Sequence, residues 1–274
     1  DVYETADLLK EAKTLVIGPA GENLVRFAAI GNDKGHFVGR TGLGAVMGAK
    51  RLKAISVRGE GKLAKADEAR FRELHREAVQ QIKDSALAGS LHAMGSDANM
   101  DIGMINGDVP VKNWSVGEDF DLSSALSGPT LSETYLTRAH ACSHCPVACK
   151  RVVLVPDGPF QTEEGPGPEY ETCGTFGTMI MNRDLAGVIK ANELCNRLGM
   201  DTISCGAAIA WTMELYEKGT LTATETDGLE LTWGNGDVEA EMLHQMCRGE
   251  GFGVIPGKGV RYMQKLFIKN GWGD

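Results

Sequence analysis

The stretch from Leu185 to Gly219, LAGVIKANELCNRLGMDTISCGAAIAWTMELYEKG, decides the fold class of this chain. Its apolar side chains recur at helical spacing, and glycine stands at both positions where a helix is expected to end. The pattern predicts two helices, 185–198 and 203–217, joined by a tight turn at Gly199. In that turn, Asp201 is the expected N-cap of the second helix.

The rest of the chain divides into a short segment that contains strands and a longer segment that is mainly helical. β-branched residues bounded by glycines predict strands at 13–18 and 52–59, with a turn and a second strand in 18–31. The strand-forming pattern ends near residue 60. Beyond it we expect an amphipathic helix at 67–88, a Gly/Asn/Asp-rich loop at 89–128 and a helix before a group of cysteines. A strand and Pro/Gly loop at 152–168 and a last helix at 260–269 complete the prediction. The expected fold is therefore α+β, with residues 1–60 as a small β-containing remnant and 61–274 as a helical domain.

The composition excludes several function classes. Of 274 residues, 42% are hydrophobic and 24% charged, which is typical of a globular protein. The net charge of −9 gives no electrostatic reason to bind nucleic acid or anionic lipid. No apolar run reaches the ~18 residues of a membrane span, and the acidic first residues do not resemble a secretion signal. We therefore expect a cytoplasmic protein that binds neither nucleic acid nor membrane.

Three cysteines stand close together in the segment His140-Ala-Cys142-Ser-His-Cys145-Pro-Val-Ala-Cys149-Lys150. Thiolates on such short loops can converge on one soft-metal centre, and the spacing favours an iron–sulfur cluster. A zinc site is the main alternative, with His140 or His144 as the fourth ligand. Buried free thiols fit less well because three of them stand at this close spacing in a turn, and a disulfide fits less well because the chain shows no sign of export.

A [4Fe–4S] cluster usually has four cysteine ligands, and four further cysteines remain in the chain: Cys173, Cys195, Cys205 and Cys247. Cys195 and Cys205 lie in apolar helical contexts, where a cysteine commonly acts as a small buried hydrophobic residue. The sequence does not single out any of the four as the fourth ligand.

A second motif is the glycine-rich segment 37–50, FVGRTGLGAVMGAK. Gly39, Gly42 and Gly44 can expose backbone N–H groups beside the guanidinium of Arg40, which suits a phosphate-bearing cofactor. The segment lacks the residues that complete a P-loop or a dinucleotide fingerprint. Glycines that only allow close helix packing are an equally good explanation.

Two further motifs carry polar side chains in candidate positions. In the segment 165–172, GPGPEYET, Glu169 and Glu171 could act as an acid or base, or could simply occupy a helix N-terminus, where the dipole favours carboxylates. In the turn NRLGMD, Asn196 and Asp201 flank Gly199 and could accept hydrogen bonds from the N–H groups of a polar heterocycle. Helix capping alone would also explain Asp201.

The four motifs occur in one order, and in that order the chain resembles the aldehyde:ferredoxin oxidoreductase family of tungsten or molybdenum bis-pterin enzymes. The matching segments are GRTGLGAVMGAKRLKAI, CSHCPVACK, GPEYET and NRLGMDTIS, and the resemblance extends over about residues 15–270. Family members are much longer than this chain. The resemblance therefore implies an internal piece, with residues 1–60 as the tail of a β-rich pterin-cradling domain and 61–274 carrying the cluster cysteines and part of the pterin site.

The resemblance also implies roles for individual residues. Cys142, Cys145 and Cys149 correspond to three ligands of a [4Fe–4S] cluster whose fourth ligand would lie beyond Asp274, as would the family's catalytic histidine. Gly39, Arg40, Gly42 and Gly44 correspond to the loop near the pterin phosphates, and Glu171 or Glu169 to an acidic residue beside the metal. Asn196, Gly199 and Asp201 match the pterin-binding motif D-x-x-G-L-D, in which this chain has Asn196 and Met200 in place of Asp and Leu.

The implied activity is oxidation of an aldehyde to a carboxylic acid, with electrons passed to ferredoxin or a similar carrier. We expect the isolated piece to be inactive. A homo-oligomer is one association state that the sequence leaves open. Two alternatives stay open: a reductase of a related branch that acts on aromatic thioesters, and a non-catalytic iron–sulfur or zinc-binding module for electron transfer or scaffolding.

Overall fold

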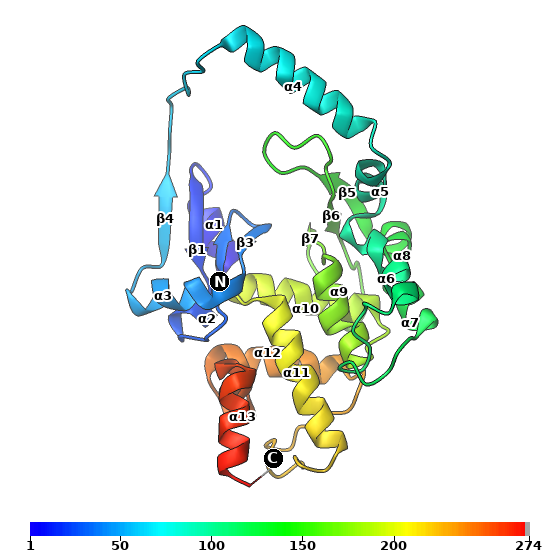
Figure 1. Ribbon diagram of the computed structural model, residues 1–274. Helices are drawn as coiled ribbons and strands as arrows, with labels where there is room; N and C mark the ends of the chain where they lie inside the picture. The colour runs from blue at the N-terminus through cyan, green and yellow to red at the C-terminus, as the bar shows by residue number, and fades with distance from the viewer. Residues whose placement is uncertain (272–274) are drawn as a thin grey trace.

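The chain begins with a small antiparallel sheet flanked by short helices (Figure 1). The structure is a computed structural model and describes residues 1–271. The sheet has the strand order β3-β2-β1-β4. Its elements are α1 (Val2–Leu8), β1 (Lys13–Ile17), α2 (Pro19–Glu22), β2 (Ile30–Asn32), β3 (His36–Val38), α3 (Leu43–Ala49) and β4 (Ala54–Val57). The strands expected at 13–18 and 52–59 are confirmed, and the second strand begins only at the end of the 18–31 stretch.

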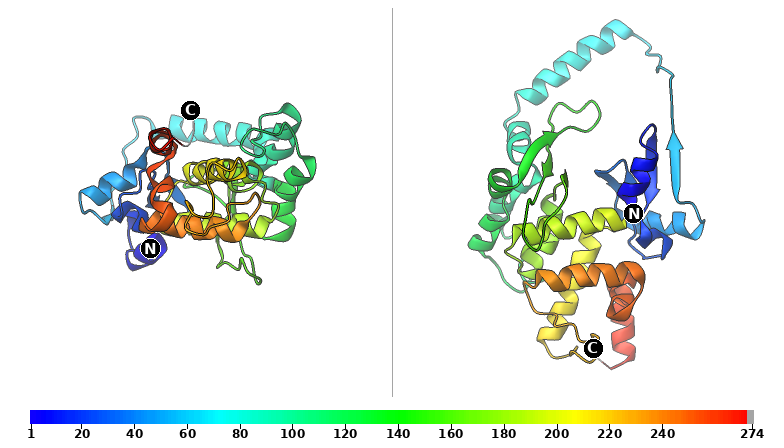
Figure 2. Two further views of the ribbon diagram at one scale, coloured as in Figure 1. Left: turned by 90° about the horizontal axis from the view of Figure 1, so that it is seen from below. Right: turned by 180° about the vertical axis from the view of Figure 1, so that it is seen from behind.

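Helix α4 (Glu68–Lys83) forms an arch that leads from β4 to the next group of helices (Figures 1 and 2). Asp67 caps the helix by accepting a hydrogen bond from the backbone N–H of Arg70. The helix buries none of its residues, and its apolar side chains Phe71, Leu74 and Ile82 are exposed. The predicted amphipathic helix therefore exists, but it ends five residues earlier than expected and its apolar face has no cover within this chain's described residues.

The prediction of a loop at 89–128 is wrong. Three helices and a 3-10 turn occupy most of this region, and a further helix begins at its end: α5 (Ala86–Met94), the turn Ser96–Asn99, α6 (Met100–Asn106), α7 (Phe120–Ala125) and α8 (Gly128–Thr134). The small polar residues that suggested a loop stand at the helix ends instead. Asp119 and Ser127 are N-caps, and Gly107 is a C-cap with φ 72°.

A second antiparallel sheet follows, with the strand order β5-β6-β7. Its strands are β5 (Leu136–His140), β6 (Lys150–Val153) and β7 (Gly165–Pro166). His140 pairs with Lys150 across the β5–β6 hairpin, so the three clustered cysteines occupy the hairpin loop, residues 141–149. The predicted strand and Pro/Gly loop at 152–168 is confirmed in outline.

The C-terminal part of the chain is helical and holds most of the core. Its helices are α9 (Tyr170–Phe176), α10 (Leu185–Leu198), α11 (Thr202–Glu217), α12 (Gly236–Arg248) and α13 (Val260–Lys269). The main cluster of buried apolar side chains lies among these helices, and it also takes in Ala20, Val25, Phe27 and Ala28 from the first 60 residues. The predicted helices at 185–198, 203–217 and 260–269 are confirmed, and the α+β fold class with them. None of the helices formed by residues 1–271 has the length and apolar character needed to cross a membrane.

Candidate functional site

The cysteine loop is shaped by two residues in left-handed backbone conformations. His144 has φ 61° and Ala148 has φ 54°, and the backbone N–H of Cys145 donates to the carbonyl of Cys142 over 3.0 Å. Cys142 is exposed, whereas Cys145 and Cys149 are half-buried. The loop therefore turns back on itself and keeps its three thiols near the protein surface.

Arg151 holds the base of this loop from beneath. Its side chain is 4% exposed and donates to the carbonyls of Cys149 and Ala148 within the loop, over 3.1 Å each, and to those of His92 and Ala93 on α5. Its main observed role is to satisfy backbone carbonyls, which fixes the loop against α5.

The loop also contacts the N-terminal sheet. The imidazole Nε2 of His36, on β3, lies 3.3 Å from Sγ of Cys142. Lys150, at the start of β6, donates a hydrogen bond to the carbonyl of Gly35. Burial, the nearby ammonium of Lys150 and the ring of His140 lower the pKa of His36. Two contacts thus join the β2–β3 hairpin to the β5–β6 hairpin.

The thiols are close enough to influence one another. Burial raises the pKa of Cys149, and the neighbouring Glu169, Cys142 and Cys145 raise it further. Among the residues that the structure describes, no group of three or more His, Cys, Asp or Glu side chains is arranged to hold a single metal ion. In an iron–sulfur cluster each thiolate binds a different iron, so a cluster does not require the three sulfurs to meet at one point.

A cavity of about 220 Å³ lies beside the cysteine hairpin. Residues from three of the predicted motifs line it together, although up to 162 positions separate those named here in the sequence. They are Gly39 from the glycine-rich segment, Glu169 and Glu171 from the acidic segment, and Asn196, Met200 and Asp201 from the NRLGMD turn. Lys150 and Arg151 complete the wall on the side of the cysteine loop.

A larger cavity of about 730 Å³ shares Gly35 and Lys150 with the smaller one. It is bounded by α1, the N-terminal sheet and the β5–β6 hairpin. Many of the charged side chains around it are paired with one another: Lys13 with Asp33, Lys34 with Asp7, Arg58 with Glu11, and Arg138 with Glu164. Ion pairs therefore surround the larger cavity, whereas the smaller cavity is lined by residues of the predicted motifs.

Asp201 is the buried carboxylate of the smaller cavity. It caps α11 by accepting hydrogen bonds from the backbone N–H groups of Ile203 and Ser204, which confirms the predicted N-cap. Its Oδ2 also lies 3.4 Å from Nε of Arg40, whose side chain is 61% exposed. The glycine-rich segment and the NRLGMD turn therefore meet through a direct ion pair.

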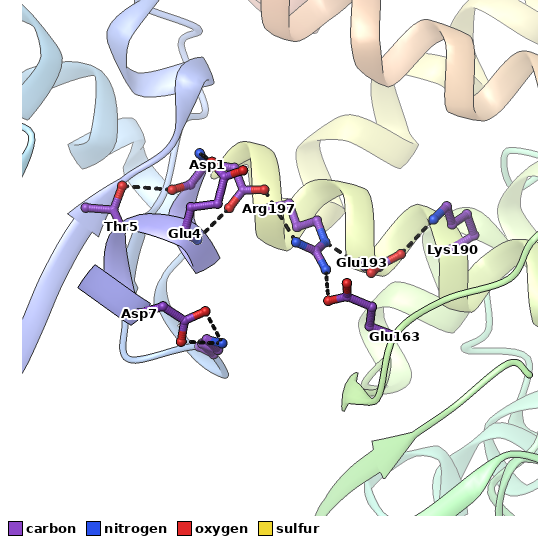
Figure 3. Close-up of polar contacts among 9 residues, drawn as sticks. Asp1, Glu4, Thr5, Asp7, Glu163, Lys190, Glu193 and Arg197 are labelled. Atoms are coloured by element: carbon purple, nitrogen blue, oxygen red, sulfur yellow. Dashed lines mark hydrogen bonds and ion pairs between the residues drawn. The ribbon is translucent and has the colours of Figure 1, made fainter. Parts of the chain in front are cut away.

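Asn196 lies near the end of α10, and its neighbour Arg197 belongs to an ion-pair network (Figure 3). The side chain of Asn196 hydrogen-bonds Tyr3, whose pKa burial raises to about 12 despite this bond. The adjacent Arg197 bonds Glu193 over 3.0 Å and Glu163 over 2.5 Å, and it approaches Asp1 at 3.4 Å. These contacts tie α1 to α10 and so set the position of Asn196 at the cavity wall.

The two candidate acids stand at the start of α9. Glu169 is the N-cap residue and Glu171 lies in the first turn, so the helix N-terminus that the sequence offered as an alternative is confirmed. Glu169 accepts a hydrogen bond from Ser96 Oγ, and the same hydroxyl accepts one from the backbone N–H of Tyr170. Both carboxylates nevertheless line the cavity, so the helix-terminal position is compatible with a role there.

The remaining candidate glycines differ from Gly39. A Cβ at Gly39 would meet no atom within 4 Å, whereas a Cβ at Gly42 would lie 2.1 Å from the carbonyl oxygen of Arg26. Gly44 is equally confined: a Cβ there would lie 2.5 Å from the carbonyl oxygen of Ala29, and its N–H already donates to Ala28. Gly42 and Gly44 therefore act in close packing, and among the three only Gly39 faces the cavity.

Gly199 also has a packing reason. It adopts φ 77° at the end of α10, and a Cβ there would lie 2.7 Å from the backbone nitrogen of Gly18. Its carbonyl accepts the N–H of Ala29 over 2.8 Å, and the N–H of Asp201 donates to the carbonyl of Phe27. The turn is thus fastened to the N-terminal segment, which brings Asp201 into reach of Arg40.

Sequence reasoning missed Asp97, a buried acid near Glu169 of the cavity wall. It is 1% exposed and sits in the 3-10 turn before α6, hydrogen-bonded to the buried thiol of Cys173. Burial raises its pKa to about 8, with a further contribution from nearby Glu169. No local pattern identifies Asp97, because it stands among small polar residues that look like a loop.

The family of the chain follows from comparison with known proteins. The model described as "Aldehyde ferredoxin oxidoreductase, N-terminal domain" matches residues 1–59, and the one described as "Aldehyde ferredoxin oxidoreductase, domains 2 & 3" matches residues 73–272. The chain belongs to the aldehyde ferredoxin oxidoreductase family, as its motifs predicted.

Curated relatives carry this name. The tungsten-containing aldehyde ferredoxin oxidoreductase of Pyrococcus furiosus is 41% identical over 246 residues, which are 89% of this chain and 40% of that protein. The enzyme of the same name from Pyrococcus horikoshii is 38% identical over 276 residues, covering 97% of this chain and 45% of that protein. The chain therefore spans less than half the length of these relatives.

Other relatives have different names. The aliphatic sulfonate oxidoreductase, WOR-like subunit, of Pyrococcus furiosus is 31% identical over 254 residues, 92% of this chain and 40% of that protein. Among solved structures, the active site complex BamBC of benzoyl coenzyme A reductase with 1,5-dienoyl-CoA is similar with a TM-score of 0.79 and 25% identity, covering 98% of this chain and 42% of that one. All these named relatives are oxidoreductases, but they act on different substrates.

Proposed function

We propose that this chain is part of an oxidoreductase that converts aldehydes to carboxylic acids at a tungsten or molybdenum bis-pterin centre. A [4Fe–4S] cluster would pass the electrons to ferredoxin or a similar carrier. One observation supports this most strongly: a single cavity collects Gly39, both candidate acids and both polar residues of the NRLGMD turn. That cavity adjoins the hairpin that presents the three cysteines.

The cysteine loop has the donor chemistry of a cluster site. Its three thiols lie near the protein surface, and only two and three residues separate them along the chain. Thiolates are the usual ligands of iron–sulfur clusters. The other four cysteines are buried within the described part of the chain. Cys142, Cys145 and Cys149 are therefore the proposed ligands, and a fourth ligand would come from outside residues 1–271.

The cavity has the polar groups that a pterin requires. The carboxylate of Asp201 and the amide of Asn196 can accept hydrogen bonds from heterocyclic N–H groups, and the open space at Gly39 admits a close approach to the backbone. Arg40 is largely exposed and can pair with a phosphate as well as with Asp201. The residues that are present thus fit both groups implied by the family.

When bound, the metal–pterin centre would supply the two-electron redox chemistry, which protein side chains cannot provide. The chain's own residues would orient the cofactor and move a proton. Glu169 and Glu171 face the cavity from the start of α9, and either can hold a proton for a reacting oxygen. Glu169 is held by Ser96, so Glu171 has more freedom to serve in that role.

Two alternative functions make different predictions about metal content and substrate. The likeness to benzoyl coenzyme A reductase favours, as a second candidate, reduction of an aromatic thioester at the same site. A zinc or iron–sulfur scaffold without a pterin would use the cysteine loop alone.

The proposal is tested on the whole oxidoreductase of which this chain is proposed to be part, by purifying it anaerobically and measuring its metals and its activity. We expect tungsten or molybdenum together with about four irons, and reduction of ferredoxin or a dye with aldehydes as substrates. Activity with an aromatic thioester but not with aldehydes would favour the second candidate. Zinc alone would exclude both enzymes.

A further inference from the structure

The contact between His36 and Cys142 links the N-terminal sheet directly to the cysteine loop. His36 stands at the first position of β3, where it pairs with Asn32 across the β2–β3 hairpin. Its Nε2 lies 3.3 Å from Sγ of Cys142, within hydrogen-bonding distance for sulfur. Because Lys150 bonds the carbonyl of the preceding residue, Gly35, the strand that carries His36 is fastened beside the loop.

Other histidines near the loop have different partners. Nδ1 of His92 lies 2.7 Å from the carbonyl oxygen of Val147, and Nδ1 of His144 lies 2.7 Å from Oγ of Ser143. The ring of His140 lies 6.4 Å from that of His36, tilted by 58°. His36 is therefore the imidazole that the fold directs at a sulfur atom in this part of the structure.

The direction of this hydrogen bond follows from the chemistry of the sulfur. A cysteine that binds iron does so as a thiolate, which has no proton to donate. The pair can then form a hydrogen bond only if Nε2 carries the proton and donates it to Sγ. Hydrogen bonds to cluster sulfurs are among the features that set the reduction potential of an iron–sulfur cluster.

We propose that His36 is a positioning residue that donates a hydrogen bond from Nε2 to Sγ of Cys142 and raises the reduction potential of the bound cluster. The inference rests on the proposed function, since it requires Cys142 to be an iron ligand. The reduced cluster carries one more negative charge than the oxidised cluster, so a donor to its sulfur ligand stabilises the reduced form more. His36, which lies outside the cysteine motif, thereby adjusts the reduction potential of the cluster.

The test measures the midpoint potential of the cluster, by a redox titration followed by electron paramagnetic resonance, in anaerobically purified holoprotein. Three variants are compared with the natural protein. His36→Leu removes the donor, and His36→Gln keeps an N–H at nearly the same place. His140→Leu is the matched control, because it removes the exposed neighbouring imidazole and leaves the contact between His36 and Cys142 intact.

We expect full iron content in all four proteins. His36→Leu should lower the ratio of reduced to oxidised cluster at a fixed potential by roughly tenfold, which is a shift of about −59 mV for a one-electron couple. His36→Gln should recover most of this shift, and His140→Leu should produce a much smaller one. A merely structural role for His36 would not give this order of potentials.

Three results would overturn the inference. Unchanged potential in His36→Leu at full iron content would show that the contact does not act on the cluster. Loss of iron in both His36 variants would show that His36 is itself a ligand. Absence of iron from the natural protein would refute the proposed function first, and that outcome is recognised before any variant is compared.

Discussion

At the scale of single residues, Asp97 is a buried acid with an unusual environment. It is buried, its Oδ1 has no hydrogen-bond partner among the residues described, and the buried thiol of Cys173 and the carboxylate of Glu169 lie nearby. Burial penalises the charged carboxylate and raises the pKa of Asp97 to about 8, against an ordinary value of 3.8. Asp97 is therefore protonated in the folded chain at neutral pH.

This raised pKa predicts a loss of stability as the pH rises. Between about pH 4 and pH 8 the unfolded chain releases the proton of Asp97 and the folded chain keeps it, so the free energy of unfolding falls throughout this range. Each pH unit in this range lowers the free energy of unfolding by on the order of 1.4 kcal/mol at most. Asp97→Asn should be more stable than the natural protein at pH 8 by a few kcal/mol and similar to it at pH 4.

Denaturant unfolding at the two pH values measures this difference. Asp121→Asn, on the exposed first turn of α7, is the control and should leave the pH dependence unchanged. If Asp97→Asn shows the same fall in stability between pH 4 and pH 8 as the natural protein, Asp97 is not the group responsible.

Residue-level prediction from the sequence succeeded where the role is local. The capping role of Asp201 follows from its place after a helix-ending glycine, and the burial of Cys195 and Cys205 follows from their apolar helices. Arg151 and His36 were not recognised, because their roles depend on carbonyls and a sulfur contributed by distant parts of the chain. The segment around Asp97 resembles a loop and has no periodic pattern of apolar residues, so the sequence does not predict that Asp97 is buried.

At the scale of elements, the packing of α3 on α2 depends on Gly48. A Cβ at Gly48 would lie 1.8 Å from the carbonyl oxygen of Gly21, which is backbone and cannot move aside cheaply. Replacing a glycine inside a helix with alanine normally stabilises the helix by about 1 kcal/mol. Here the steric cost, typically about 1–3 kcal/mol or more for overpacking, exceeds that gain.

We therefore expect Gly48→Ala to lower the free energy of unfolding, by up to about 2 kcal/mol after the gain in helix propensity is subtracted. Gly39→Ala is the matched control, since the space around Gly39 is open and its φ of −78° suits any residue. Denaturant titrations of both variants provide the measurement. Equal stability of Gly48→Ala and the natural protein would mean that α2 and α3 are not packed as closely as described.

Long elements were predicted well and short ones poorly. Helix α10 was predicted with its observed bounds and α11 to within one residue, because each has several turns of periodic apolar residues and a clear stop. Helices α5 to α7 have six to nine residues each, too few for a periodic pattern, and their capping residues resemble those of a loop. Helix ends and loops share the same residue types, which explains the incorrect loop at 89–128.

At the scale of the whole molecule, the candidate site forms where segments from both ends of the sequence meet. The N-terminal sheet supplies Gly39 and His36, the second sheet supplies the cysteine loop, and the turn between α10 and α11 supplies Asp201. The motifs predicted these residues one by one, with the exception of His36, and the family resemblance implied their common purpose. Their approach to one another depends on long-range contacts, such as Arg40 with Asp201 and His36 with Cys142, that no local pattern contains.

The account rests on binding of an inorganic iron core by the β5–β6 hairpin loop. The most direct measurement is the iron content and visible absorbance of the anaerobically purified protein, compared with Cys145→Ser and Cys247→Ser. Cys247 is a buried thiol on α12 and serves as the control. We predict that Cys145→Ser loses the iron and the iron–sulfur absorbance while Cys247→Ser keeps both. Iron and absorbance that survive undiminished in Cys145→Ser would contradict the account.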